Sequence, residues 1–220
     1  MLEKMDLFFE NRLKEYEEHM LSAIEGAREF YPFTAAQLPL EEGCEVLDLG
    51  CGTGLELDAY FARNPGACVT GIDLSEAMLG ALAKKFPDKC SDKKLRLIHG
   101  SYFDVRLEEE AYDAAVSVES LHHFTGEQKT FLYRKLCRAL KANGFFILTD
   151  YFAESNELER EYFRSFEQMK REQNISDDGF YHFDTPLTVE HEMELLREAG
   201  FSRVWILKNW GATYTIRAER

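Results

Sequence analysis

The feature that most constrains this chain is a group of three glycines directly after a short apolar run. Residues 46–49 have the length and apolar character of a buried strand, and Gly50, Gly52 and Gly54 follow them. An amphipathic stretch, 55–62, begins at once and indicates a helix. Glycines let the backbone turn tightly and approach a ligand closely, and a helix N-terminus offers free N–H groups. The sequence therefore predicts a strand–turn–helix unit that binds a nucleotide-like ligand.

The spacing of these glycines narrows the ligand. The dinucleotide fingerprint is G-x-G-x-x-G, whereas this chain has G-x-G-x-G, and no Lys-Ser or Lys-Thr pair of a phosphate loop follows. Asp48 stands two residues before the first glycine. A carboxylate there would repel a pyrophosphate and attract an ammonium group. A nucleoside that carries an amino-acid tail, such as S-adenosylmethionine, fits this pattern.

On these residues the chain resembles the class I S-adenosylmethionine-dependent methyltransferases, from about residue 45 to its end. A second acid, Asp73, ends the apolar run 69–72 roughly twenty residues after the turn. In the family such an acid accepts hydrogen bonds from both ribose hydroxyls. The resemblance implies S-adenosylmethionine as cofactor. It also implies a set of cofactor-binding residues: Asp48, Gly50, Cys51, Gly52, Thr53, Gly54, Asp73, Leu74, Met78, Ser101, Tyr102, Phe103 and Glu119.

Apolar runs and amphipathic stretches alternate along most of the chain. Strands are expected at 45–49, 68–72, 95–99, 114–118 and 145–149, and helices at 55–63, 75–85 and 127–140. This alternation predicts an α/β fold with parallel strands. With the resemblance, it implies a Rossmann-like, seven-stranded, mostly parallel sheet with helices on both faces. Residues 201–208 and 212–218 should form its antiparallel C-terminal hairpin, and 155–173 and 188–200 two further helices.

An extra N-terminal helix is expected over residues 2–31, with Pro32 at its end. We expect one methyltransferase domain over 1–220. Its parts are an N-terminal helical lid at 1–40, a cofactor-binding core at 41–150, a helical insertion over the substrate at 151–186, and a closing helix and strands at 187–220.

Candidate catalytic residues follow the fourth expected strand. His122 and His123 are the best general-base candidates, because imidazole titrates near neutral pH. Adjacent histidines are expected to point to different faces, so we expect no shared metal. Glu119 should lie near the methionine part of the cofactor. Ser101 stands where family members commonly carry an Asp for the adenine amino group, and its hydroxyl can serve instead.

A substrate pocket is expected from two other parts of the chain. Tyr16 and His19 lie one turn apart on the N-terminal helix, which either closes the site as a lid or contacts another element, including a second copy in a homodimer. Tyr151 and His182 belong to a second cluster that also includes Asp184, in the segment that covers the substrate pocket of resembling proteins.

Bulk composition limits the partners. Lys and Arg total 26 and Asp and Glu total 40, a net charge of −14, which disfavours a nucleic-acid partner. The five cysteines form no C-x-x-C pair and indicate reduced thiols. No signal-peptide pattern and no membrane-spanning apolar run are present, so we expect a cytoplasmic protein without a membrane partner.

Three functions therefore stay open. The first is methyl transfer to an oxygen or nitrogen atom of a small molecule. The second comes from residues 188–201 and 205–212, which resemble the ending of carboxy-S-adenosylmethionine synthase and imply a modified cofactor or tRNA wobble-uridine modification. The third is a non-catalytic cofactor-binding protein.

Overall fold

A seven-stranded sheet forms the centre of the computed structural model, which describes residues 1–176 and 179–220. Its strand order is β3-β2-β1-β4-β5-β7-β6. The parallel strands are β1 (Glu45–Leu49), β2 (Cys68–Asp73), β3 (Leu95–His99), β4 (Tyr112–Val118) and β5 (Leu140–Tyr151). The antiparallel hairpin pairs β7 (Thr213–Glu219) with β5 and with β6 (Arg203–Trp210). The predicted fold class is confirmed.

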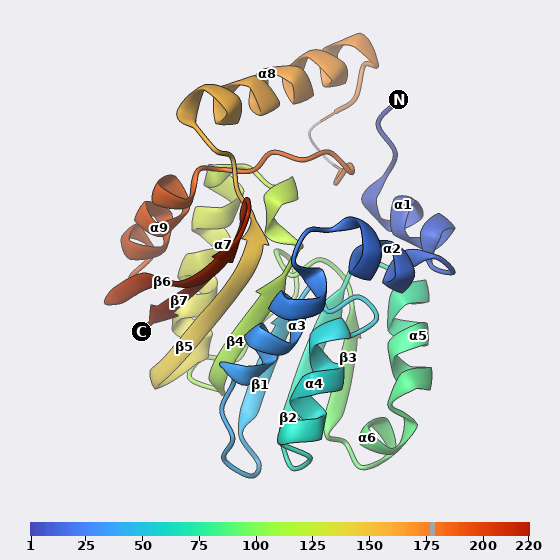
Figure 1. Ribbon diagram of the computed structural model, residues 1–220, viewed down its shortest axis with the longest axis vertical. Coiled ribbons are helices and arrows are strands. Elements are labelled where there is room, and N and C mark those ends of the chain that lie inside the picture. Colours follow the sequence, from blue (N-terminus) through green and yellow to red (C-terminus); the bar gives the residue numbers. More distant parts are fainter. Residues whose placement is uncertain (177–178) are drawn as a thin grey trace.

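Helices cover both faces of the sheet (Figure 1). One face carries α3 (Ala27–Ala36), α4 (Leu55–Arg63) and α5 (Glu76–Lys85), followed by the short α6 (Pro87–Ser91). The other carries α7 (Gly126–Ala139) and α9 (Val189–Glu198). The central strands β1 and β4 and the second half of β5 are almost wholly buried between these layers, which explains their continuous apolar sequence. This arrangement leaves the carboxyl ends of the parallel strands free to form a site.

Side chains cap the starts of α5, α7, α8 (Asn156–Glu172) and α9. The Ser75 hydroxyl accepts the Met78 N–H, and the Thr188 hydroxyl accepts the His191 N–H. Thr125 and Gln128 form a complete capping box at α7. These side chains satisfy N–H groups that a helix leaves unpaired at its start. A 3-10 turn, η1 (Leu121–His123), precedes α7 and was not expected from the sequence.

The prediction of one N-terminal helix over residues 2–31 is wrong. The segment forms α1 (Met5–Arg12), α2 (Tyr16–Ala23) and the start of α3. Gly26, with a φ of 76°, interrupts the helical conformation before α3. A Cβ at this position would lie 2.5 Å from the Trp210 side chain. Pro32 lies inside α3, where burial of neighbouring residues such as Phe30 and Thr34 outweighs the missing N–H.

Two segments lie over the carboxyl ends of the strands (Figure 1). The first is α1 and α2. The second is α8 (Asn156–Glu172), which has no buried residue, with the chain that follows it. The N-terminal strand-like segment joins the second: Lys4 bridges Tyr181, Met5 N–H donates to Phe180 O, and His182 N–H donates to Glu3 O. Of the insertion expected at 151–186, residues 177–178 lie outside the described part. No described helix is both long and apolar enough to cross a membrane.

Candidate functional site

The glycine turn between β1 and α4 is poorly suited to residues that carry a side chain. Gly50, Gly52 and Gly54 have φ values of 73°, 48° and 71°, in the left-handed region that L side chains rarely adopt. A Cβ on Gly50 would lie 2.1 Å from Ser120 Oγ. The Gly52 N–H donates to Asp73 Oδ2 over 2.9 Å, which ties the turn to the end of β2. The turn thus brings bare backbone to the edge of the sheet.

A crevice opens over this turn, and we call it the glycine crevice. Its lining comes from the strand tips, α1, α2 and the loop before α9: Met5, Phe9, Tyr16, Gly50, Gly52, Asp73, Leu74, Met78, Gly100, Ser101, Tyr102, Glu119, Ser120, His123, Phe124 and Phe180. Eight of the expected cofactor residues line it, namely Gly50, Gly52, Asp73, Leu74, Met78, Ser101, Tyr102 and Glu119. Cys51, Thr53, Gly54, Asp48 and Phe103 do not, and Phe103 packs between Phe124 and Phe180 instead.

Asp73 is fixed at the mouth of this crevice. Its Oδ1 accepts the Ser75 N–H over 2.8 Å while Oδ2 accepts the Gly52 N–H. Burial raises the pKa of this carboxyl, and the two N–H donors oppose the rise. Each oxygen keeps a further lone pair for a ligand. The geometry suits a carboxylate that accepts hydrogen bonds from a diol.

Asp48 lies beneath the turn rather than in the crevice. It is 1% exposed and hydrogen-bonds Glu56 of α4. Burial raises its pKa well above the usual range, and burial also raises the pKa of Glu56 to about 7. As ionised groups, Asp48 Oδ2 and Glu56 Oε1 lack a donor among the described residues, so a proton on one carboxyl joins the pair. A proton shared by the pair makes Asp48 a weaker partner for a cation. Its expected contact with an ammonium group stays a prediction.

A second hollow of about 500 Å³ adjoins the crevice, and we call it the histidine cavity. It is lined by Phe8, Phe9, Arg12, Glu15, Tyr16, His19, Met20, Ile24, Glu119, His122, His123, His182 and Asp184. The expected pocket residues Tyr16, His19 and His182 are among them. Tyr151 does not line the cavity, and its hydroxyl lies 2.7 Å from that of Tyr162. The hollow is large enough for a small metabolite.

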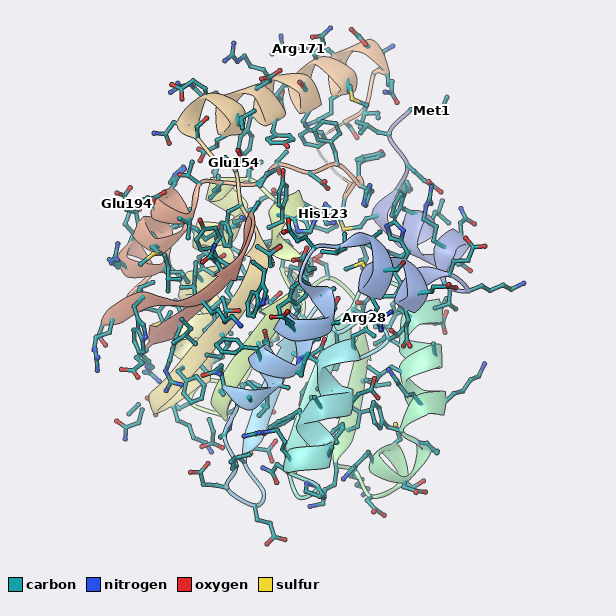
Figure 2. The ribbon with its side chains drawn as sticks, viewed as in Figure 1. Met1, Arg28, His123, Glu154, Arg171 and Glu194 are labelled. Atoms are coloured by element: carbon teal, nitrogen blue, oxygen red, sulfur yellow. The ribbon has the colours of Figure 1, made fainter. Side chains whose placement is uncertain are left out.

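The expectation that His122 and His123 point to different faces is wrong. The turn η1 brings their ring centres to 4.0 Å. His122 Nδ1 lies 2.5 Å from Asp150 Oδ1, and His123 Nδ1 lies 3.2 Å from Asp184 Oδ1 and 3.3 Å from Phe183 O. Figure 2 labels His123 where these elements converge, at the strand tips below α8. A 3-10 turn, with three residues per turn, places neighbouring side chains differently from the helix start that the sequence suggested.

The charges in this cluster depend on one another. Burial lowers the pKa of His122, but Asp150 and Asp184 outweigh it and raise the pKa to about 9. Burial and the neighbouring His122 lower the pKa of His123, and burial with His123 lowers that of His182 to about 4. Near pH 7, His122 is therefore charged while its neighbours His123 and His182 are neutral.

Glu119 stands at the boundary between the two hollows. Its backbone has a φ of 49°, a strained value for a residue with a side chain. Its Oε1 accepts a hydrogen bond from the Thr213 hydroxyl over 3.3 Å, and burial with the nearby Asp150 raises its pKa to about 8. Strain that persists at a cavity wall is typical of a functional position.

Residues that the sequence pattern did not mark complete the site. Asp150 orients His122. It lies at the end of β5, on the same edge of the sheet as Asp73 and Glu119, and this position could have marked it in the sequence. Phe9, Phe180 and Ser120 also line the crevice. The first two come from segments that no motif marks, so only the tertiary structure reveals them.

Comparison with known proteins also indicates a methyltransferase fold. The family model of a methyltransferase domain matches residues 46–144. A carboxy-S-adenosyl-L-methionine synthase from Wolinella succinogenes is 30% identical over 200 residues, which cover 86% of this chain and 80% of that protein. A tRNA (carboxymethyluridine(34)-5-O)-methyltransferase from Arabidopsis thaliana is 31% identical over 129 residues, 58% of this chain but only 29% of that protein.

A solved structure shares the fold. Phosphoethanolamine N-methyltransferase 2 of Haemonchus contortus, in complex with S-adenosyl-L-methionine, superposes with a TM-score of 0.68 at 18% identity. The match covers 92% of this chain and 44% of that chain. At this identity the likeness concerns the fold alone.

The residues present suit the family's cofactor, S-adenosylmethionine. A Cβ would fill the cradle at Gly50, and Asp73 offers two oxygens to a ribose. Tyr102 and Leu74 supply apolar surface beside it. From this geometry and from the relative matched over four-fifths of its length, the chain belongs to the class I S-adenosylmethionine-dependent methyltransferases.

Proposed function

We propose that this chain transfers a methyl group from S-adenosylmethionine to an oxygen or nitrogen atom of a small molecule held in the histidine cavity. One observation carries the proposal: the glycine crevice and the histidine cavity share four lining residues, Phe9, Tyr16, Glu119 and His123. A donor in one hollow and an acceptor in the other would meet at these side chains. Methyl transfer needs this kind of in-line placement of two ligands.

In this proposal the glycine crevice holds the cofactor. Asp73 accepts hydrogen bonds from the ribose hydroxyls, Ser101 and the Tyr102 backbone face the adenine, and Glu119 lies toward the amino-acid end. When bound, S-adenosylmethionine supplies an electrophilic methyl group on a positively charged sulfur. Phe9 and Tyr16 place aromatic rings at the junction, which favour a cationic neighbour and exclude water.

The histidine cavity holds the acceptor. His123 lines both hollows and is 4% exposed at its side chain, so we place it against the reacting atom of the acceptor. His122 stands behind it, held by Asp150. His123, which is neutral near pH 7, activates the acceptor's O–H or N–H by taking its proton, or the pair does so through a bound ion. His19 and His182 line the outer part of the cavity and contact the rest of the acceptor.

The test uses the full chain with S-adenosylmethionine and fractionated pools of small metabolites. We expect S-adenosylhomocysteine, measured by mass spectrometry, to form with at least one pool, together with a product heavier by one methyl group. Calorimetry should give binding of S-adenosylhomocysteine without any acceptor. Tight cofactor binding with no product from any pool would favour the non-catalytic alternative, and absence of both would exclude the proposal.

The Wolinella succinogenes relative supports a second candidate, synthesis or use of a carboxylated cofactor. A carboxylate next to the sulfur needs a cation near the junction of the hollows. Among the described residues that line either hollow, Arg12 is the one Lys or Arg, and Glu3 already binds it over 3.1 Å. The charged His122 is likewise already paired with Asp150. The unmodified cofactor therefore fits better. Mass spectrometry of the ligand released from the denatured protein would distinguish the two.

A tRNA acceptor is the less favoured alternative, although the Arabidopsis thaliana relative acts on tRNA by name. This chain spans only 29% of that protein and carries a net charge of −14. Such a charge repels a phosphate backbone. We therefore keep a small molecule as the proposed acceptor, whether or not the chain forms a homodimer.

A further inference from the structure

Three ligand-type atoms converge on one point of the histidine cavity. They are one imidazole nitrogen each of His122 and His123 and a carboxylate oxygen of Asp184. All three lie within 4.8 Å of one another, although they come from η1 and from a segment about sixty residues later. Two imidazoles and one carboxylate form a donor set that transition-metal sites in proteins commonly use.

The distances suit a cation between these atoms. Asp184 Oδ1 lies 3.2 Å from His123 Nδ1 and 3.7 Å from His122 Nε2. Donors bound to a tetrahedral metal at 2.0–2.1 Å stand about 3.3–3.4 Å apart. Both edges are therefore within a few tenths of an ångström of the metal-bound geometry. Asp184 is 45% exposed at its side chain, so it can make this small adjustment without disturbing the core.

A second layer of contacts already orients one ligand. With its Nδ1–H directed at Asp150, 2.5 Å away, His122 presents its Nε2 to the point of convergence. A carboxylate behind a metal-binding histidine fixes its tautomer and ring direction in this way. Asp150 is itself fixed, because its oxygens accept the N–H groups of Leu121 and Tyr151. A mobile surface histidine would have no such support.

A competing trio, Glu119, His122 and Asp150, also gathers within 4.8 Å. Asp150 is the poorer ligand, because its Oδ1 already faces His122 Nδ1 and the Tyr151 N–H, and its Oδ2 accepts the Leu121 N–H. The trio with Asp184 keeps the bond between His122 Nδ1 and Asp150 and faces the cavity, so it is the better site. Binding of a cation there releases the protons from His122 Nε2 and His123 Nδ1.

We propose that His122, His123 and Asp184 bind one divalent transition-metal cation of the Zn²⁺ or Co²⁺ type. Nitrogen donors favour such cations over Mg²⁺ and Ca²⁺, which take oxygen ligands. Three protein ligands leave a fourth position, and it faces the cavity where a donor atom of the acceptor can fill it. The role in acceptor activation rests on the proposed function, whereas the binding of the cation does not.

The test measures Co²⁺ binding to the full chain after removal of metals with a chelator. We expect one equivalent of Co²⁺ to bind with visible d–d absorption, and Zn²⁺ to displace it. Asp184→Asn and His123→Asn should each weaken binding at least tenfold. His191→Asn is the matched control, because His191 also contacts a carboxylate, Glu159, over 2.8 Å but has no second histidine. It should bind Co²⁺ as the parent does.

Two results would overturn the metal site. One is no Co²⁺ binding below about 1 mM, which leaves His122 as an imidazolium between two carboxylates. The other is equal Co²⁺ affinity in the parent, Asp184→Asn and His123→Asn proteins. Circular dichroism checks that each variant is folded, and Asp184 lies in a loop where Asn preserves the size of the side chain.

The metal site and the proposed function fail in different ways. Methyl transfer that continues at full rate in excess chelator would remove the cation from the reaction and keep the methyltransferase. Co²⁺ binding by a chain that never binds S-adenosylhomocysteine would keep the metal site and remove the proposed function.

Discussion

The glycine crevice and the histidine cavity share a wall but are assembled in different ways. The part of the crevice around the glycine turn comes from strand ends and turns within residues 50–120, each close to a sequence signal. The histidine cavity joins α1, α2, η1 and the segment that carries His182 and Asp184. A motif can mark the first kind of site, because its parts are local. The second kind depends on packing between distant segments, where no short pattern exists.

This difference in assembly predicts that changes in one hollow leave the other intact. Single substitutions in each hollow, and beneath the glycine turn, test the separation. The strongest effect is expected at the glycine turn and the weakest behind His122.

Gly50→Ala should have the strongest effect. Its Cβ would lie 2.1 Å from Ser120 Oγ, and the residue has a φ of 73°. We expect affinity for S-adenosylhomocysteine to fall at least a hundredfold, about 2.7 kcal/mol by calorimetry. Gly80→Ala in α5 is the control, because a Cβ at Gly80 would meet nothing within 4 Å. Equal affinity in both variants would mean that the ligand does not use the glycine turn.

Glu56→Gln tests the buried acid pair beneath the turn. Burial raises the pKa of Glu56 from 4.5 to about 7, so the folded chain keeps a proton that the unfolded chain loses. The free energy of unfolding should therefore fall as pH rises from about 4.5 to 7, by of order 2 kcal/mol. Glu56→Gln should make this fall shallower.

Urea unfolding at pH 5 and pH 8 measures the effect of Glu56→Gln. The exposed Glu76→Gln serves as the control and should keep the parent's profile. An unchanged pH dependence in Glu56→Gln would show that Glu56 does not take up the expected proton in the folded chain.

Asp73→Asn should weaken cofactor binding tenfold to a hundredfold. The amide removes the charge and one acceptor oxygen from a group that already binds two N–H donors. Asp113→Asn is the matched control, because Asp113 lies near the amino end of β4, away from the edge of the sheet that forms the site. Cobalt binding at the histidine cavity should be the same in both variants. Loss of cobalt binding in Asp73→Asn would contradict the separation of the two hollows.

Asp150→Asn should act on the histidine cavity alone. The change removes the carboxylate that orients His122, and kcat/KM for the acceptor should fall about tenfold. Affinity for S-adenosylhomocysteine should stay within about twofold of the parent, because Asp150 does not line the glycine crevice. A parallel loss of both quantities would show that the two hollows respond as one unit.

Much of the scaffold could be predicted before the structure was known. The strands at 45–49 and 95–99 and the helix at 55–63 have the expected bounds, because each is a short periodic run between clear breaks. The N-terminal helices could not be predicted. The break before α3 is at Gly26, which lies against Trp210 near the far end of the chain.

The same contrast holds within the site. Asp73 was found because a strand ends there, and its two N–H donors belong to the same local unit. Glu119 was placed near the cofactor, but its bond to Thr213 depends on β7. Asp184 was noticed only as part of a loop cluster, and its approach to His122 and His123 follows from how that loop packs.

The α/β architecture and the glycine turn follow from the amino-acid order alone, because the apolar pattern of the strands, the helix caps and the glycines of the turn are local features of the sequence. Three-dimensional packing was needed to set the direction of His122 and His123, the burial of Asp48 against Glu56, and the joining of the two hollows at Tyr16. Those features arise from contacts between segments far apart in the chain. Only the packed core fixes such contacts, since no local preference specifies them.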